Sequence, residues 1–176
     1  MAESRETEGT IQEGLPMDSV TLAEVQAFFF KAMVGGWAVG GQKIKIADMP
    51  GYKAIPFRDG DLYLLDRYCV VPNSTKSAGT TTIWYKDVPV WVMNYGGSYE
   101  ESAIKFLKSM LRMAYDSGIF CGGRGSRLGT DSLRDLVYFN RPRLNDFAKF
   151  DGMEQIFNTR TGSCLGYHEY WGMSLL

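Results

Sequence analysis

The chain has 176 residues, of which 45% are hydrophobic and 22% charged, and these are ordinary values for a globular domain. The formal net charge of −1 lacks the basic excess that neutralises phosphates, so a direct nucleic-acid partner is not expected. No apolar run is long enough to span a bilayer, and the acidic start of the chain does not fit a signal peptide. We therefore expect a cytoplasmic protein without a membrane partner.

The cysteines and the single histidine limit the metal chemistry of the chain. Cys69, Cys121 and Cys164 lie far apart and form no Cys-x-x-Cys pair, whereas disulfide scaffolds and zinc sites use paired or closely spaced cysteines. His168 is the only histidine, which excludes a histidine-rich metal site. We expect three reduced thiols, no metal and no cofactor.

The chain divides into a short tail and one domain. Residues 1–17 are rich in Glu, Thr, Gly and Ser and carry few apolar side chains, which predicts a disordered acidic tail. Residues 18–176 are of the right length for a single domain.

A first helix is predicted by Thr21 and Glu24, which have the spacing of a capping box, and by the apolar residues at helical spacing that follow. The pair Gly35-Gly36 predicts its end. The run from Phe28 to Phe30 is wider than one apolar stripe, so it either packs on several sides in the core or forms a dimer surface.

A second helix is predicted by the capping-box spacing of Ser98 and Glu101, and Gly118 predicts its end. Between the two helices, residues 80–95 read as a hairpin whose turn is Lys86-Asp87. A polar loop is predicted at 72–79 before this hairpin.

Further strands are predicted by β-branched and aromatic runs, with Arg141-Pro142-Arg143 as a break and Asn158–Gly162 as a turn. These strands are at 43–46, 52–57, 61–71, 136–139, 147–150, 153–157 and 166–171. Because short turns join most of them, we predict an α+β fold: a mostly antiparallel, twisted sheet of about six strands with two main helices packed on one face.

Several short motifs, in their order along the chain, resemble the bacterial and archaeal family known as domain of unknown function 5680, over roughly residues 25–176. The motifs are Phe29-Phe30-x-Ala32, Trp37-Ala38-x-Gly40, Gly60-Asp61-x-Tyr63, Asp66-x-Tyr68, Trp84-Tyr85-Lys86-x-x-Pro89-x-Trp91-x-Met93-Asn94-Tyr95-x-Gly97, Arg124-Gly125 and Phe150-x-Gly152-x-Glu154-x-Ile156. Members occur alone or behind a helix-turn-helix of the XRE regulator class. No helix-turn-helix is predicted in this chain, so the resemblance implies a fold and a site neighbourhood but neither DNA binding nor an activity.

Aromatic residues are the most suggestive feature of the predicted sheet. Tyr63, Trp84, Trp91 and Tyr95 come from adjacent strands, and with Tyr68 they can form an aromatic floor for a ligand or a dimer interface. Packing in the core is the other interpretation of the same residues.

A glycine-rich loop, Gly123-Arg124-Gly125-Ser126-Arg127, is the second candidate. Its backbone N–H groups and the guanidinium groups of Arg124 and Arg127 are suited to a phosphate or carboxylate. The loop is not a P-loop, because no Gly-Lys-Ser/Thr follows it, and an ordinary solvated loop is the alternative.

These residues lead to three hypotheses of different classes. The first is a non-catalytic domain that binds a small anionic or aromatic ligand, or a protein partner, near the Arg124 loop. The second is a small hydrolase or transferase that uses His168 with Glu154 or Glu169 as acid and base. The third is a homodimeric scaffold without a ligand, with the Phe28–Phe30 face or the sheet as its interface.

Overall fold

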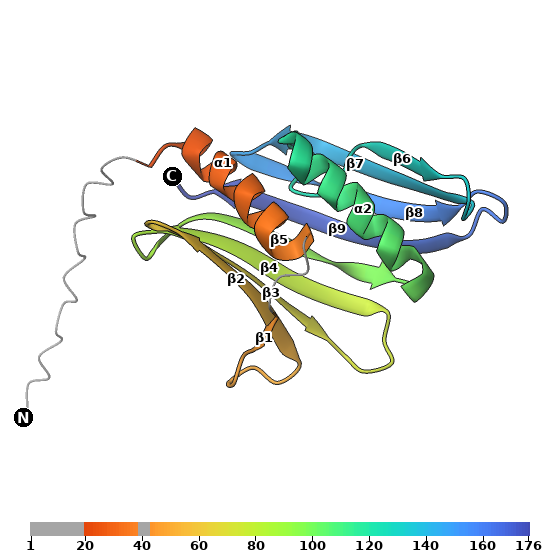
Figure 1. Ribbon diagram of the computed structural model, residues 1–176, viewed down its shortest axis with the longest axis horizontal. Coiled ribbons are helices and arrows are strands. Elements are labelled where there is room, and N and C mark those ends of the chain that lie inside the picture. Colours follow the sequence, from red (N-terminus) through yellow and green to blue (C-terminus); the bar gives the residue numbers. More distant parts are fainter. Residues whose placement is uncertain (1–19, 39–42) are drawn as a thin grey trace, which may run out of the picture.

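The computed structural model describes residues 20–38 and 43–176, so the predicted tail at 1–17 lies outside the described residues, as does Gly40 of the motif Trp37-Ala38-x-Gly40. One antiparallel sheet curves around two helices, which both lie on its inner face (Figure 1). The α+β class is confirmed. The expected number of about six strands is wrong, because the described chain forms nine.

The helices are α1 (Leu22–Met33), a short π-helical stretch η1 (Val34–Ala38) and α2 (Glu101–Ser117). The strands are β1 (Ile44–Lys45), β2 (Tyr52–Asp59), β3 (Leu62–Val70), β4 (Lys76–Tyr85), β5 (Val88–Tyr99), β6 (Leu128–Asp131), β7 (Leu136–Asp146), β8 (Lys149–Asn158) and β9 (Cys164–Ser174). Their order in the sheet is β1-β2-β3-β4-β5-β9-β8-β7-β6. Two meanders, separated by α2, are therefore joined where β9 pairs with β5.

The start of α1 is as predicted, but its end is not. Thr21 Oγ1 accepts a hydrogen bond from the Glu24 N–H at 3.2 Å, and Glu24 Oε2 accepts one from the Thr21 N–H at 2.8 Å, which completes the capping box. Gly35-Gly36 does not stop the helix, which continues as η1. A Cβ at Gly35 would lie 2.7 Å from the Phe57 ring, so the glycine is needed for close approach to β2.

The capping box predicted for α2 is wrong. Ser98 lies in β5, where its hydroxyl donates a hydrogen bond to Thr75 Oγ1 at 2.7 Å, and the residue before the helix is Glu100. Gly118 ends the helix as predicted, in the left-handed conformation with φ 66°.

The central hairpin is confirmed, with Lys86 and Asp87 as a two-residue turn at φ 47° and φ 66°. Positive φ at both positions is the signature of a type I′ turn, which matches the twist of the flanking strands. The loop predicted at 72–79 is too long, because β4 already begins at Lys76 and pairs there with Ser98.

The second meander contains more strand than predicted. β6 was not expected, and β7 continues through Pro142 instead of breaking there. The pairing of β7 with β8 shifts register between Pro142 and Leu144, and such a bulge accommodates a residue that has no N–H. The two strands predicted at 147–150 and 153–157 are one strand, β8.

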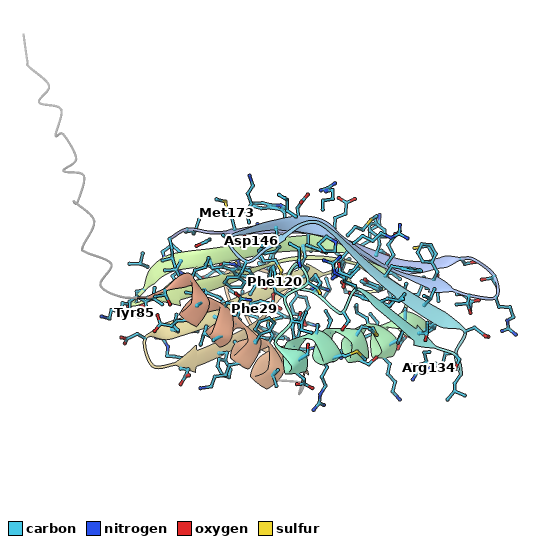
Figure 2. All side chains as sticks on the ribbon, turned by 90° about the horizontal axis from the view of Figure 1, so that it is seen from above. Phe29, Tyr85, Phe120, Arg134, Asp146 and Met173 are labelled. Atoms are coloured by element: carbon cyan, nitrogen blue, oxygen red, sulfur yellow. The ribbon has the colours of Figure 1, made fainter. Side chains whose placement is uncertain are left out.

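The core fills the space between the helices and the inner face of the sheet. The ring of Phe29 lies 5.1 Å from that of Trp91 and 5.9 Å from that of Tyr115, between centroids. Figure 2 shows Phe29 and Phe120 in this layer and Met173 on the opposite, outer face. Phe28 and Phe29 are buried, and Phe30 is partly buried against the same cluster, so the Phe28–Phe30 run packs in the core.

None of the described helices combines the length and the apolar character needed to cross a membrane.

Candidate functional site

A pocket of about 480 Å³ lies between α2 and the inner face of β3, β4, β5 and β9. Buried polar and aromatic residues line its base: Tyr95, Tyr99, Arg124 and His168. Apolar side chains line its walls: Val70 from β3 and Ile104 and Leu107 from α2. The rim is exposed and includes Lys43, Lys76, Lys108 and Glu101. The polarity of the pocket therefore changes with depth, from charged through apolar to hydrogen-bonding.

The base of the pocket contains a buried ion pair. Arg124 and Glu154 are 4% and 0% exposed, and the Arg124 Nε and Nη2 groups donate to Glu154 Oε1 at 3.0 and 2.5 Å. The hydroxyl of Tyr138 donates to the other carboxylate oxygen at 2.5 Å. Burial by itself raises the pKa of Glu154, but the adjacent Arg124 charge outweighs it and holds that pKa below the usual value. The pair is therefore ionised and internally neutral.

Arg124 reaches this position because the glycine-rich loop is folded into the domain. The side-chain amide of Asn140 donates to the carbonyl groups of Cys121 and Gly125 at 2.8 and 2.7 Å, and the Tyr170 hydroxyl donates to Asn140 Oδ1 at 2.6 Å. Gly123 has φ 68°, a conformation that favours glycine. A solvated loop, one of the two alternatives from the sequence, does not describe residues 121–125, which are all buried.

His168 connects the ion pair to the pocket. Its Nδ1 lies 3.2 Å from Arg124 Nη2 and 3.6 Å from Glu154 Oε1, and its Nε2 lies 3.2 Å from the hydroxyl oxygen of Ser77. Arg124 is the closer partner and can only donate, so Nδ1 is the acceptor and Nε2 carries the proton that is donated to Ser77. Burial, followed by the Arg124 charge, lowers the pKa of His168 to about 4, so the ring is neutral at pH 7.

Two buried tyrosines complete the base. Tyr95 donates to Asp66 Oδ1 at 2.8 Å, and its ring lies 5.2 Å below the guanidinium carbon of Arg124. Tyr99 packs against the His168 ring with centroids 5.0 Å apart. The Tyr99 hydroxyl is the one buried side-chain polar atom in the described part of the chain that lacks a hydrogen-bond partner. Burial and the nearby Glu154 charge raise the pKa of Tyr99, although the two groups do not reach hydrogen-bond geometry.

Glycines in the sheet make room for these large side chains. A Cβ at Gly79 would lie 2.6 Å from the Tyr95 hydroxyl, and a Cβ at Gly97 would lie 2.9 Å from the His168 ring. Each ring therefore packs over a position of the neighbouring strand that carries no side chain, an arrangement found where aromatic residues cover strand glycines.

The structure does not bring the six predicted ligand-binding residues together. Tyr95 and Arg124 line the pocket, and Trp91 is fully buried in the core on the same inner face. Tyr63 and Trp84 form a cross-strand pair on the outer face, with ring centroids 5.5 Å apart. Arg127 is exposed and is not among the residues that line the pocket.

The single aromatic floor is therefore a wrong prediction. Tyr63 and Tyr68 are separated by an odd number of positions in β3, so strand alternation places them on opposite faces. Tyr68 lines the pocket, whereas Tyr63 does not.

Sequence reasoning missed Ser77 and Tyr99 as parts of the site. Ser77 falls within the loop predicted at 72–79, whereas the structure places it on β4. Glu154 enters the sequence analysis through the resemblance motif and the hydrolase hypothesis, not as a partner of Arg124. It shares one face of β8 with Gly152 and Ile156, which are both buried, so its carboxylate points inward and needs a cationic partner. Of the two carboxylates proposed to act with His168, Glu154 lies beside it and Glu169 is on the exposed outer face.

A larger depression of about 570 Å³ lies along β1, β2 and the end of β3. Its described lining, which includes Lys45, Met49 and Val71, contains no buried residue and therefore no buried ionisable group. The pocket over Arg124 is the better candidate, because there several polar side chains converge on one space.

Comparison of the chain with protein-family models, with curated proteins and with solved structures gave no match. The resemblance to the domain of unknown function 5680 stays a prediction.

Proposed function

We propose that the protein is a non-catalytic binding domain for a small organic anion, which occupies the pocket between α2 and the sheet. The observation that carries the proposal is the net positive charge of the rim. Among the residues that line the pocket there, three are lysines, Lys43, Lys76 and Lys108, and one is a carboxylate, Glu101. Because the Arg124 charge below is balanced by Glu154, the lysines supply the net positive charge. A volume of about 480 Å³ suits a small molecule.

The proposal is tested first by native mass spectrometry of the untagged protein from its expression host. A bound mass that is lost on denaturation supports the binding function and gives the size of the ligand. A charge reversal then locates the site. Lys108→Glu is expected to weaken binding of an aromatic carboxylate by about two- to fivefold, as exposed charges contribute about 1 kcal/mol or less.

Lys105→Glu is the matched control for that charge reversal. Lys105 is exposed on the same helix, and it does not line the pocket. An equal loss of affinity in both variants would show a general effect of net charge and would contradict the assignment of the pocket.

A hydrolase is the second candidate, because His168 lies between Ser77 and Glu154 in space. This arrangement is that of a nucleophile, a base and a carboxylate. The hydrogen bonds disfavour it. A base must accept the serine proton on Nε2, but donation by Arg124 to Nδ1 leaves the proton on Nε2. Hydrolysis of p-nitrophenyl acetate by the wild type that is abolished by Ser77→Ala would favour this candidate instead.

A homodimeric scaffold is the third candidate, with the outer face of the sheet as its interface. Trp171 and Met173 are 53% and 41% exposed there. Light scattering after size-exclusion chromatography at micromolar concentration tests it, and a monomer would rule the dimer out.

A further inference from the structure

We infer that the ligand carries, at the end opposite its anionic group, a neutral hydrogen-bond acceptor such as a carbonyl oxygen, which binds the hydroxyl of Ser77. The inference rests on the proposed function and adds the orientation and the chemical class of the ligand. Its anionic group stays at the lysine rim, and its neutral end reaches the base of the pocket.

The direction of a chain of hydrogen bonds supports the role of Ser77. Arg124 donates to Nδ1 of His168, and the ring then donates from Nε2 to the Ser77 oxygen at 3.2 Å. Ser77 therefore already accepts a hydrogen bond, and its own O–H proton is left to donate. That proton has no acceptor among the hydrogen bonds of the described residues, and Ser77 lines the pocket.

The same chain makes Ser77 a stronger donor than an isolated serine. Each hydrogen bond polarises the next, and a chain that begins at a guanidinium ion is polarised toward its far end. A neutral acceptor at that end completes the chain without a new buried charge. We therefore expect Ser77 to select for an acceptor.

Charge balance at the base argues against the opposite orientation. Arg124 is already neutralised by Glu154, and His168 is neutral, so an incoming carboxylate would meet no uncompensated cation. Desolvating a carboxylate without such a partner is costly. At the rim the lysines are exposed, and an anion there keeps part of its hydration. The apolar walls, with Ile104 and Leu107, suit the body of the molecule between the two ends.

Three probes of similar shape test the inference with the full chain. 4-Acetylbenzoate has both an anion and a carbonyl acceptor, 4-isopropylbenzoate lacks the acceptor, and 4-isopropylacetophenone lacks the anion. Dissociation constants are measured by ¹⁵N–¹H NMR titration, which also reports the residues that respond. We expect 4-acetylbenzoate to bind about five- to tenfold more tightly than 4-isopropylbenzoate, the increment of one hydrogen bond.

Ser77→Ala is expected to remove this preference by weakening 4-acetylbenzoate while leaving 4-isopropylbenzoate unchanged. Ser109→Ala is the control, because the Ser109 hydroxyl donates to the Phe106 carbonyl within α2 and does not line the pocket. If the Ser77→Ala variant does not fold, the inference is decided by the affinities of the wild-type protein for the three probes.

The two proposals fail in different ways. Equal affinity for the two benzoates in the wild type would overturn the inference and leave the binding function standing, provided that both responses depend on Lys108. Tighter binding of 4-isopropylacetophenone than of either benzoate would overturn the anion-binding function itself. Absence of binding by all three probes would count against both.

Discussion

Arg124 and Glu154 form an ion pair that is almost completely removed from solvent, with the guanidinium group 4% exposed and the carboxylate 0% exposed. Further hydrogen bonds hold the pair: the Tyr138 hydroxyl donates to the second carboxylate oxygen, and His168 Nδ1 accepts from the guanidinium group. Such a pair need not add to the stability of the fold. Each partner nevertheless depends on the other, because removal of one leaves the other as an uncompensated buried charge.

The first prediction follows from this dependence. Arg124→Met leaves the Glu154 charge unpaired and is expected to destabilise the protein by about 3–5 kcal/mol. Glu154→Gln is destabilising in the wild type for the same reason. In the Arg124→Met background, however, Glu154→Gln removes the unpaired charge and keeps an acceptor for Tyr138, so there it is stabilising.

Urea denaturation of the four proteins measures this reversal of sign. Arg112→Ala is the control, because it removes a surface ion pair with Asp116 whose side chains are 58% and 45% exposed. That pair is expected to contribute about 1 kcal/mol or less. Additive effects of Arg124→Met and Glu154→Gln would show that the two charges are not coupled.

The second prediction compares two buried tyrosines. Tyr138→Phe removes a 2.5 Å hydrogen bond to the Glu154 carboxylate and is expected to cost about 1.5–3 kcal/mol. Tyr99→Phe removes a buried hydroxyl that has no partner, so it is expected to be neutral or stabilising. The midpoint of urea unfolding reports both changes, and a loss of stability in Tyr99→Phe equal to that in Tyr138→Phe would mean that the Tyr99 hydroxyl is paired in solution.

The elements that the sequence predicted well are those whose signals are local. The capping box at Thr21 and the two-residue turn at Lys86-Asp87 depend only on residues within four positions of one another. The misassigned elements depend on distant partners. Gly35 resembles a helix stop, but it is needed because the Phe57 ring of β2 packs closely against it. Pro142 resembles a break, but the register shift against β8 absorbs it.

The candidate site was only partly predictable for the same reason. Arg124 was singled out because two arginines stand among glycines, and this local signal was sufficient. Its partner Glu154 is 30 residues away, and only the pairing of β7, β8 and β9 brings Glu154, Tyr138 and His168 to one place. The separation of Tyr63 from Tyr68 was predictable, because strand alternation alone places them on opposite faces.

The third prediction uses two neighbouring glycines of β5 that face opposite sides of the sheet. A Cβ at Gly97 would lie 2.0 Å from the Tyr167 carbonyl oxygen, whereas a Cβ at Gly96 would lie 3.4 Å from the Cβ of Ala78, an ordinary contact. Gly97→Ala must therefore move backbone, and a loss of more than about 3 kcal/mol or failure to fold is expected.

Gly96→Ala is the matched control and is expected to change stability by less than about 1 kcal/mol, because alanine has less conformational freedom to lose than glycine. Thermal unfolding followed by circular dichroism compares the two variants. Equal tolerance of both substitutions would contradict the pairing of Gly97 with His168 across β5 and β9.

The fourth prediction concerns the stability of the protein at acidic pH. Burial and the Arg124 charge lower the pKa of His168 from 6.5 to about 4, so between these values the unfolded chain binds more protons than the folded one. The contribution of His168 to the free energy of unfolding is therefore fully present above pH 6.5. It is lost as the pH falls toward 4, and the total loss for this group is about 3 kcal/mol. Glu154, whose pKa lies below 4.5, adds a further loss only at lower pH, as its carboxylate is protonated in the folded state.

His168→Gln is expected to flatten the dependence of unfolding free energy on pH between 7 and 5, since the substituted amide does not titrate. The measurement has an internal check, because the chain contains one histidine and its ring C–H signal is unambiguous in a proton NMR titration. A midpoint near 6.5 would show that the ring is solvated and not enclosed beside Arg124. The hydrogen-bond chain to Ser77 would then lose its fixed direction, because a protonated ring cannot accept from the guanidinium group.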